Sequence, residues 1–118
     1  MEYCILFYET AESAAERDDP ARAPAYWGAW SAYIQSVRGS GLMRGGAGLQ
    51  PPATATAVRL KGGKRQVQDG PLIDAKEQLG GFVVIEAPDL DTALGWAARS
   101  PSASGAGVEV RPVLPPMQ

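Results

Sequence analysis

Residues 3–8 read YCILFY, six apolar residues without a break, and this stretch decides the fold. Its length and its aromatic and β-branched content predict a β-strand rather than a helix. A strand with one face in water alternates apolar and polar residues, so a strand that is apolar throughout should be covered on both faces. Residues 82–87 (FVVIEA) predict a second strand of the same kind.

The segments between these strands change period. Apolar residues between 26 and 37 recur at helical spacing and predict a helix that ends at Gly39 or Gly41. Residues 9–20 are polar and acidic, and they predict a loop that can include a short helical turn. The glycine-broken residues 42–49 predict a short strand.

The rest of the chain predicts a hairpin, a helix and a closing strand. Residues 54–61 and 64–68 flank Gly62-Gly63, a pair typical of a tight hairpin turn, and the basic tip of this hairpin is expected to be solvated. Asp89 is placed to cap a helix that Ser100-Pro101 ends. Residues 108–113 then predict a strand at a sheet edge.

This order of elements predicts an α+β plait: one mostly antiparallel sheet with two helices on one face. The length of 118 residues fits a single domain, residues 1–118. Two helices cover only one face of a sheet, whereas residues 3–8 and 82–85 are apolar on both faces. We therefore expect a second copy to cover the other face, which makes the protein a homodimer through its sheet.

Composition excludes several kinds of chemistry. The chain has no histidine, which rules out Ser-His-Asp and Cys-His catalysis, and with one cysteine it makes a zinc site very improbable. We expect no metal site and no cofactor. A net charge of −2 gives no electrostatic case for nucleic acid or an anionic membrane. The lone Cys4 and the lack of an evident signal peptide or membrane span favour the cytoplasm.

Residues 66–81 (QVQDGPLIDAKEQLGG) form the strongest candidate site. One interpretation is structural: Asp69-Gly70-Pro71 makes a turn, Asp74 and Glu77 have the spacing of a helix cap and its partner, and Gly80-Gly81 ends that helical turn. The other interpretation is functional. Asp69, Lys76 and Glu77 would then converge beside the end of the sheet, with backbone N–H groups nearby.

Trp27 and Trp30 lie on the apolar stripe of the first predicted helix. This spacing favours burial of both side chains against the sheet. The alternative is a role in binding, and Trp27 is our candidate for a ligand-binding residue outside the 66–81 segment.

The chain resembles the YciI-related (YCII/DGPF-domain) family over nearly its whole length. The residues that carry the resemblance are Asp69-Gly70-Pro71-Leu72, Lys76-Glu77-Gln78-Leu79-Gly80-Gly81, and the segments at 47–52, 89–91, 96–99 and 108–112. The resemblance implies a ferredoxin-like plait that pairs face to face as a dimeric α/β barrel. The chain departs from the family at Leu72, where phenylalanine is usual.

The resemblance implies less about activity. Most DGPF-type proteins have no established function, and many are encoded beside sigma factors, which implies a regulatory link. In one branch a His–Asp pair is the proposed catalytic dyad, a role that this histidine-free chain cannot fill.

Two functions from different classes follow. The first is a dimeric module that binds a small molecule or has a regulatory role, with Gly70, Pro71, Lys76 and Trp27 as ligand-binding candidates. The second is a lyase-like or isomerase-like enzyme in which Asp69 or Glu77 acts as general base, with Lys76 as electrostatic partner. A carboxylate serves as a base at neutral pH only where burial or neighbouring charges raise its pKa.

Overall fold

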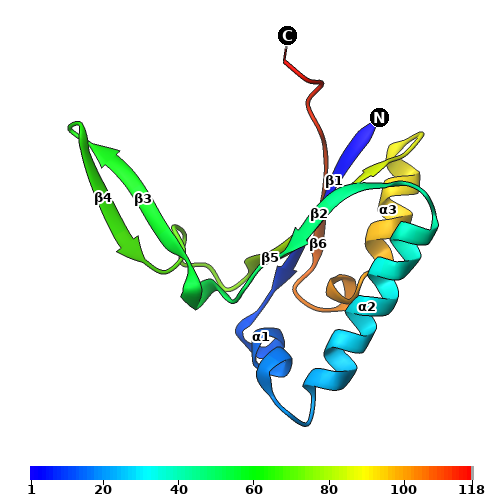
Figure 1. Cartoon of the computed structure of the whole chain (residues 1–118), viewed down its shortest axis with the longest axis horizontal. Helices are drawn as coiled ribbons and strands as arrows, with labels where there is room; N and C mark the ends of the chain where they lie inside the picture. The colour runs from blue at the N-terminus through cyan, green and yellow to red at the C-terminus, as the bar shows by residue number, and fades with distance from the viewer. Residues whose placement is uncertain (118) are drawn as a thin grey trace.

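The two apolar stretches pair with each other at the centre of the sheet, in a computed structural model that describes residues 1–117. β1 (Glu2–Glu9) runs antiparallel to β5 (Gln78–Glu86), with Leu6 opposite Phe82. β2 (Met43–Gly48) pairs with the outer side of β5, and β6 (Val108–Pro112) with the outer side of β1. The sheet is antiparallel throughout, with the strand order β2-β5-β1-β6 (Figure 1).

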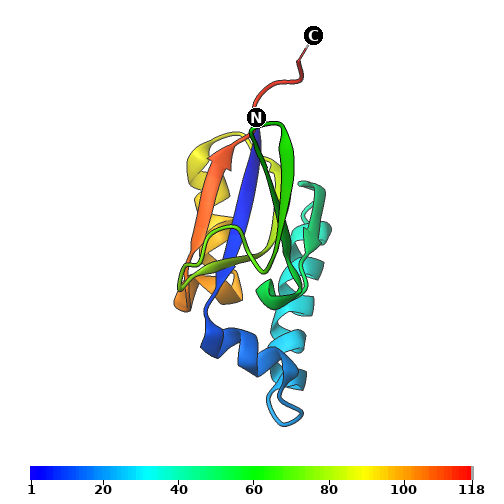
Figure 2. The same ribbon diagram turned by 90° about the vertical axis from the view of Figure 1, so that its left-hand side faces the viewer.

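One face of this sheet carries the core. Alternate residues of the two central strands point to the same face, and the core is built from these and from residues of two helices. The helices are α2 (Ala23–Gly39) and α3 (Leu90–Ala98), which lie on the same side of the sheet (Figures 1 and 2). The core residues are Tyr3, Ile5, Phe7, Tyr33, Val37, Val83, Ile85, Ala87, Ala93 and Ala97.

The opposite face has no helix over it within the described residues. We call it the open face and define it by Cys4, Leu6, Phe82 and Val84, which share one side of β1 and β5 and are all half-buried. Desolvation raises the pKa of the Cys4 thiol, and the nearby Arg111 guanidinium opposes this shift only in part. The side chains of the open face are apolar. The raised pKa of Cys4 keeps its thiol in the neutral form.

The predicted loop at residues 9–20 is wrong, because α1 (Ala11–Asp18) occupies most of it. Thr10 caps this helix: its hydroxyl accepts a hydrogen bond from the Ser13 backbone N–H, and the Ser13 hydroxyl accepts one from the Thr10 N–H. Threonine and serine at these positions satisfy the free N–H groups of the first helical turn. The sequence did not predict α1 because this helix has no stripe of large apolar residues, which is the usual signal of a helix.

The helical turn predicted for Asp74–Glu77 is also wrong. Residues 70–77 are irregular, and β5 begins at Gln78, so Gly80 and Gly81 lie inside a strand. The Gln78 side-chain amide donates hydrogen bonds to the carbonyls of Ile73 and Ala75, which fixes the segment as a loop. A single helical turn with no packing partner does not compensate for the free-energy cost of nucleating it.

The Asp89 cap is confirmed. Its carboxylate accepts hydrogen bonds from the Thr92 N–H and hydroxyl, and these bonds lower its pKa. The predicted end of α2 is confirmed as well, since the helix stops at Gly39 and Gly41 takes a φ of 78°. Two single-turn helices, η1 (Pro52–Thr54) and η2 (Pro101–Ser104), complete the connections.

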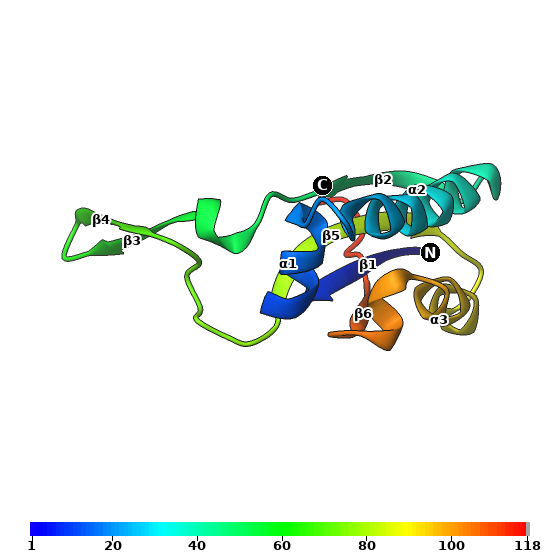
Figure 3. The same cartoon turned by 90° about the horizontal axis from the view of Figure 1, so that it is seen from below.

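The predicted hairpin forms, but it stands apart from the main sheet. β3 (Thr56–Lys61) and β4 (Lys64–Asp69) pair only with each other and turn at Gly62 and Gly63, whose φ angles of 57° and 75° suit glycine. We call residues 56–69 the arm and the four-stranded sheet with α1–α3 the body. The arm projects from the body on the side away from α2 and α3 (Figures 1 and 3). The expectation of a single sheet was therefore wrong.

Candidate functional site

A pocket lies between α2 and the β2 edge of the sheet. Its volume is about 410 Å³, within the ~300–1,000 Å³ range typical of small-molecule sites. Phe7, Trp30, Ile34, Met43 and Val83 form its apolar lining, and Gly46, Gly48 and Gly81 contribute bare backbone. At the end nearest α1, the lining includes Glu9, Arg17, Tyr26 and Trp27.

The apolar part of the pocket is held by an aromatic cluster. The Phe7 ring meets the Trp30 ring edge-on at 4.9 Å and the Tyr33 ring at 5.7 Å. The Tyr33 hydroxyl donates a 2.9 Å hydrogen bond to the Trp96 carbonyl, and burial raises the pKa of Tyr33 to about 12. Interlocked edge-on rings resist rearrangement, so this wall of the pocket is preformed.

The glycines of β2 and β5 keep the opposite wall flat. A Cβ on Gly46 would lie 2.6 Å from the Phe82 carbonyl oxygen, and one on Gly81 would lie 2.9 Å from the Ala47 carbonyl oxygen. Neither position tolerates a side chain without a backbone shift. Gly48 differs, because a Cβ there would meet nothing within 4 Å. The glycines of this strand therefore allow β2 and β5 to lie close together, and they leave backbone exposed beside the pocket.

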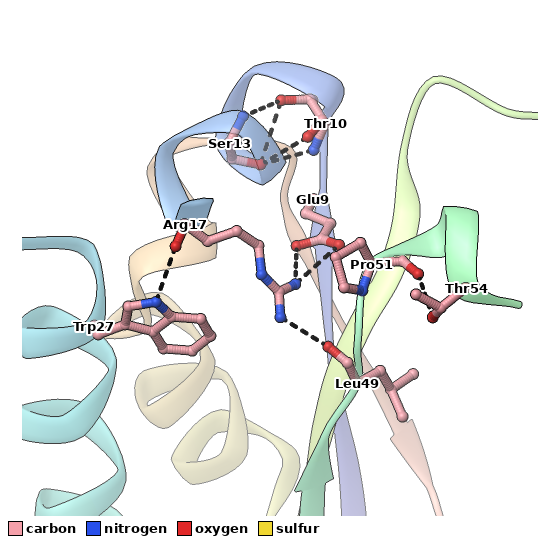
Figure 4. Close-up of polar contacts among 8 residues, drawn as sticks. All are labelled: Glu9, Thr10, Ser13, Arg17, Trp27, Leu49, Pro51 and Thr54. Atoms are coloured by element: carbon pink, nitrogen blue, oxygen red, sulfur yellow. Dashed lines mark hydrogen bonds and ion pairs between the residues drawn. The ribbon is translucent and has the colours of Figure 1, made fainter. Parts of the chain in front are cut away.

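A buried ion pair closes one end of the pocket. Glu9 continues the buried side of β1, and Arg17 reaches it from α1 (Figure 4). The Arg17 Nη1 lies 3.0 Å and 3.3 Å from the two Glu9 carboxylate oxygens, and the two side chains are only 9% and 6% exposed. Gly80 makes room for this carboxylate, because a Cβ there would lie 3.2 Å from it.

Arg17, on α1, also forms hydrogen bonds with α2 and with the segment that follows β2. Its Nη2 donates a 2.9 Å hydrogen bond to the Leu49 carbonyl beyond β2, and its backbone carbonyl accepts one from the Trp27 indole N–H (Figure 4). The guanidinium carbon lies 5.1 Å from the centre of the Trp27 ring, within cation–π range. Burial raises the pKa of Tyr26 beside it, and the Glu9 charge adds to that shift.

Sequence reasoning missed Glu9 and Arg17. The signal was present, because Glu9 follows Tyr3, Ile5 and Phe7 at a spacing of two residues and so belongs to the buried face. A carboxylate on a buried face needs a partner, and Arg17 is the first cation after it in the chain. The pair was missed because the polar and acidic residues 9–20 predict a loop, in which Glu9 has no assigned partner.

Trp27 is the one predicted site residue that lines this pocket. Its side chain is 47% exposed, so the expected burial against the sheet is wrong, whereas Trp30 is half-buried against the core. Trp27 also meets Tyr26 edge-on, with ring centres 5.0 Å apart. The exposed indole therefore forms part of a binding surface rather than of the core.

The other predicted residues lie around the base of the arm. Pro71 lines a smaller, apolar pocket of about 300 Å³, which shares Leu49 and Gln50 with the larger one. Gly70, at a φ of 96°, is half-buried. Asp69, Lys76 and Glu77 are exposed, line neither pocket, and have no side-chain hydrogen bond or ion pair in residues 1–117.

No group of three histidine, cysteine, aspartate or glutamate residues within residues 1–117 is arranged to hold a metal ion. In the same part of the chain, no helix is both long enough and apolar enough to cross a membrane. The lining of the larger pocket itself provides aromatic rings, bare backbone, a neutralised ion pair and the Arg38 side chain.

These features define a small α+β protein with an aromatic pocket between a helix and a glycine-rich sheet edge. The chain belongs to the YCII-related family, because residues 1–116 match the YCII-related domain, and this confirms the resemblance. It is 33% identical over 117 residues to an uncharacterized protein of Rhizobium meliloti (strain 1021), covering 96% of this chain and 92% of that protein.

The fold also resembles a solved structure. This is 5-chloro-2-hydroxyhydroquinone dehydrochlorinase (TftG) from Burkholderia phenoliruptrix AC1100, in complex with 2,5-dihydroxybenzoquinone. The TM-score is 0.56, and the match covers 97% of this chain and 94% of that one. The identity is 16%, so the likeness concerns the fold alone.

Proposed function

We propose that this chain is a small-molecule-binding protein whose larger pocket takes a small planar aromatic molecule with one acidic group. The observation that carries the proposal is the pocket itself, with ring faces and edges on one side, bare glycine backbone on the other, and Glu9–Arg17 at the end. A flat ring fits between two such walls, since aromatic side chains favour stacked or edge-on ring contacts.

The charges of the lining favour an acidic ligand. Glu9 and Arg17 neutralise each other, and Arg38 is the remaining charged residue of the pocket lining. The lining therefore carries a net positive charge of one, which suits a phenolate or an aryl carboxylate. The fold neighbour in complex with 2,5-dihydroxybenzoquinone, a small planar ring with acidic hydroxyl groups, supports a planar acidic ligand of similar size.

Calorimetric titration with 2,5-dihydroxybenzoquinone and with benzoate tests the proposal. We expect saturable binding by the wild-type protein and its loss in Gly48→Leu, because the new side chain enters the open space that Gly48 leaves beside the pocket. Gly95→Leu on α3 is the matched control, since it also enters open space but lies outside the pocket lining. Equal binding by both variants, or no binding of any aryl acid by the wild-type protein, would refute the proposal.

The enzyme alternative remains a proposal of its own. Asp69 or Glu77 would act as general base in it, yet both carboxylates are exposed and lie outside the two pockets. The carboxylate that does line the larger pocket is Glu9, and Arg17 contacts both of its oxygens. If the wild-type protein converts an aryl acid and Asp69→Asn or Glu77→Gln abolishes that conversion while still binding the acid, the enzyme alternative is favoured.

We also propose that the protein is a homodimer with a ferredoxin-like plait in each copy. The order β2-β5-β1-β6 with α2 and α3 on one face supports the plait, and the apolar open face supports the dimer. Light scattering during gel filtration at micromolar concentration should give twice 12.4 kDa, and a monomer would contradict the dimer. No feature of residues 1–117 bears on the link to sigma factors, which stays a prediction.

A further inference from the structure

The arm is a two-stranded ribbon without support from its own chain. β3 and β4 contact each other, and within the described residues they have no comparable contacts with another element. An isolated two-stranded hairpin is marginally stable at best in water, and a packing partner is what usually stabilises it. The arm therefore needs a surface that the single chain does not supply.

One face of the arm carries three apolar side chains, with Arg65 opposite Leu60 and the polar pair Thr56 and Asp69 at its base. Val58 lies opposite Val67 in the ladder, and Leu60 follows Val58 two residues on, so all three share a face. Their exposed fractions are 57%, 60% and 77%. The other face carries Arg59, Lys61, Lys64, Gln66 and Gln68. Between its polar base and Arg65, the first face places three large apolar side chains side by side, as in a strand pair that is covered on one face.

The arm and the body carry opposite charges. Residues 56–69 contain four basic residues and one acidic residue, a formal charge of +3. The rest of the chain contains seven basic and twelve acidic residues, a formal charge of −5, which accounts for the total of −2. Charges of opposite sign on two regions of one chain favour contact between the arm of one copy and the body of another.

The geometry places the arm where a second copy could meet it. The arm extends on the side of the sheet opposite α2 and α3, which is also the side of the open face (Figures 1 and 3). A ribbon of two six-residue strands offers roughly 20 × 10 Å, or about 200 Å² of flat face. A stable interface needs about 800 Å² on each partner. The arm alone is too small, so it must act together with the open face.

We infer that the arm docks through Val58, Leu60 and Val67 on the body of a second copy of this chain and clamps a dimer whose open faces meet. Two-fold symmetry makes the contact reciprocal, so each copy both gives and receives an arm. The inference goes beyond the proposed ligand and does not depend on the pocket.

Sedimentation equilibrium of two matched variants tests the arm. Leu60→Asp puts a charge among the three apolar side chains, and Gln66→Asp puts the same charge on the other face of the same hairpin. We expect Leu60→Asp to raise the dimer dissociation constant at least about tenfold and Gln66→Asp to change it less than about threefold. A monomeric wild-type protein, or equal effects of the two variants, would overturn the inference.

Hydrogen exchange gives a second measurement that does not need a variant to fold. The amides of residues 56–69 should exchange quickly in dilute, monomeric protein and more slowly as dimer forms. Protection of the arm that does not change with protein concentration, in a range where sedimentation shows the dimer forming, would also overturn the inference.

Discussion

The body and the arm are built from the same kind of antiparallel strand pair, yet they differ in what surrounds them. In the body, alternate side chains of β1 and β5 pack against α2 and α3, and Ile5 and Ile85 are fully buried. In the arm, the same alternation leaves Val58, Leu60 and Val67 mostly exposed. Strand pattern alone therefore specifies the ladder, while tertiary partners decide whether that ladder gains stability from burial.

Loss of the buried ion pair should have the largest effect on stability. In Glu9→Ala, Arg17 remains buried without its partner, and we expect a loss of about 3–5 kcal/mol in the free energy of unfolding. Urea denaturation at fixed protein concentration measures it. The comparison from the arm is Lys64→Met at the exposed tip, which should change stability by less than about 0.5 kcal/mol. A loss below about 1 kcal/mol for Glu9→Ala would show that the pair is not sheltered.

A cavity in the core should cause the second-largest loss in the free energy of unfolding. Ile85→Ala removes fully buried methyl groups and should cost about 2–5 kcal/mol. Leu60→Ala in the arm should cost less than about 0.5 kcal/mol in dilute, monomeric protein, because that side chain is already in water. Its cost should grow with protein concentration as the arm docks. Thermal melts over a dilution series measure both, and a large, concentration-independent cost for Leu60→Ala would break the comparison.

The phenol of Tyr33 should give a smaller effect with a pH signature. Its folded pKa of about 12 lies above the unfolded value of about 10, so the unfolded state loses its proton first. The contribution of Tyr33 is therefore complete below pH 10 and is lost as the pH rises toward 12. Tyr33→Phe removes the hydrogen bond to the Trp96 carbonyl and should cost about 1 kcal/mol at neutral pH.

Urea denaturation of both proteins between pH 8 and 12 would measure this dependence on pH. The stability difference between wild type and Tyr33→Phe should shrink above pH 10. A constant difference across that range would mean that the phenol ionises equally well in the folded protein.

The smallest effect is expected at the base of the arm. Asp69 is exposed and its carboxylate has no hydrogen bond in residues 1–117, so Asp69→Ala should change stability by less than about 0.5 kcal/mol. The turn predicted at Asp69-Gly70-Pro71 therefore has no hydrogen bond to the Asp69 carboxylate within residues 1–117. A drop of several degrees in melting temperature would contradict this expectation of a small effect and would indicate that Asp69 contacts the second copy in the dimer.

Much of the fold was predictable because local rules and tertiary packing agree there. The unbroken apolar residues 3–8, the helical stripe that includes Tyr33, the Asp89 cap and the Gly62-Gly63 turn each have one dominant local solution, and the structure follows it. The candidate site was predicted less well. Of the residues that the sequence predicted for the site, only Trp27 lines the larger pocket. Glu9 and Arg17, which also line it, were missed.

The sequence by itself determined most of the strands, the hairpin, the class of fold, the family and the exclusion of histidine chemistry, because composition, period and turn residues are local properties of the chain. Only the tertiary structure decided that α1 folds back so that Arg17 meets Glu9, and that the hairpin leaves the sheet as an arm. The Arg17 side chain is also held by the Leu49 carbonyl, 32 residues along the chain, and the main sheet that leaves the hairpin out is paired between distant segments. Such contacts form where the free energy of burial exceeds the cost of ordering the chain, a balance that no short stretch of residues records.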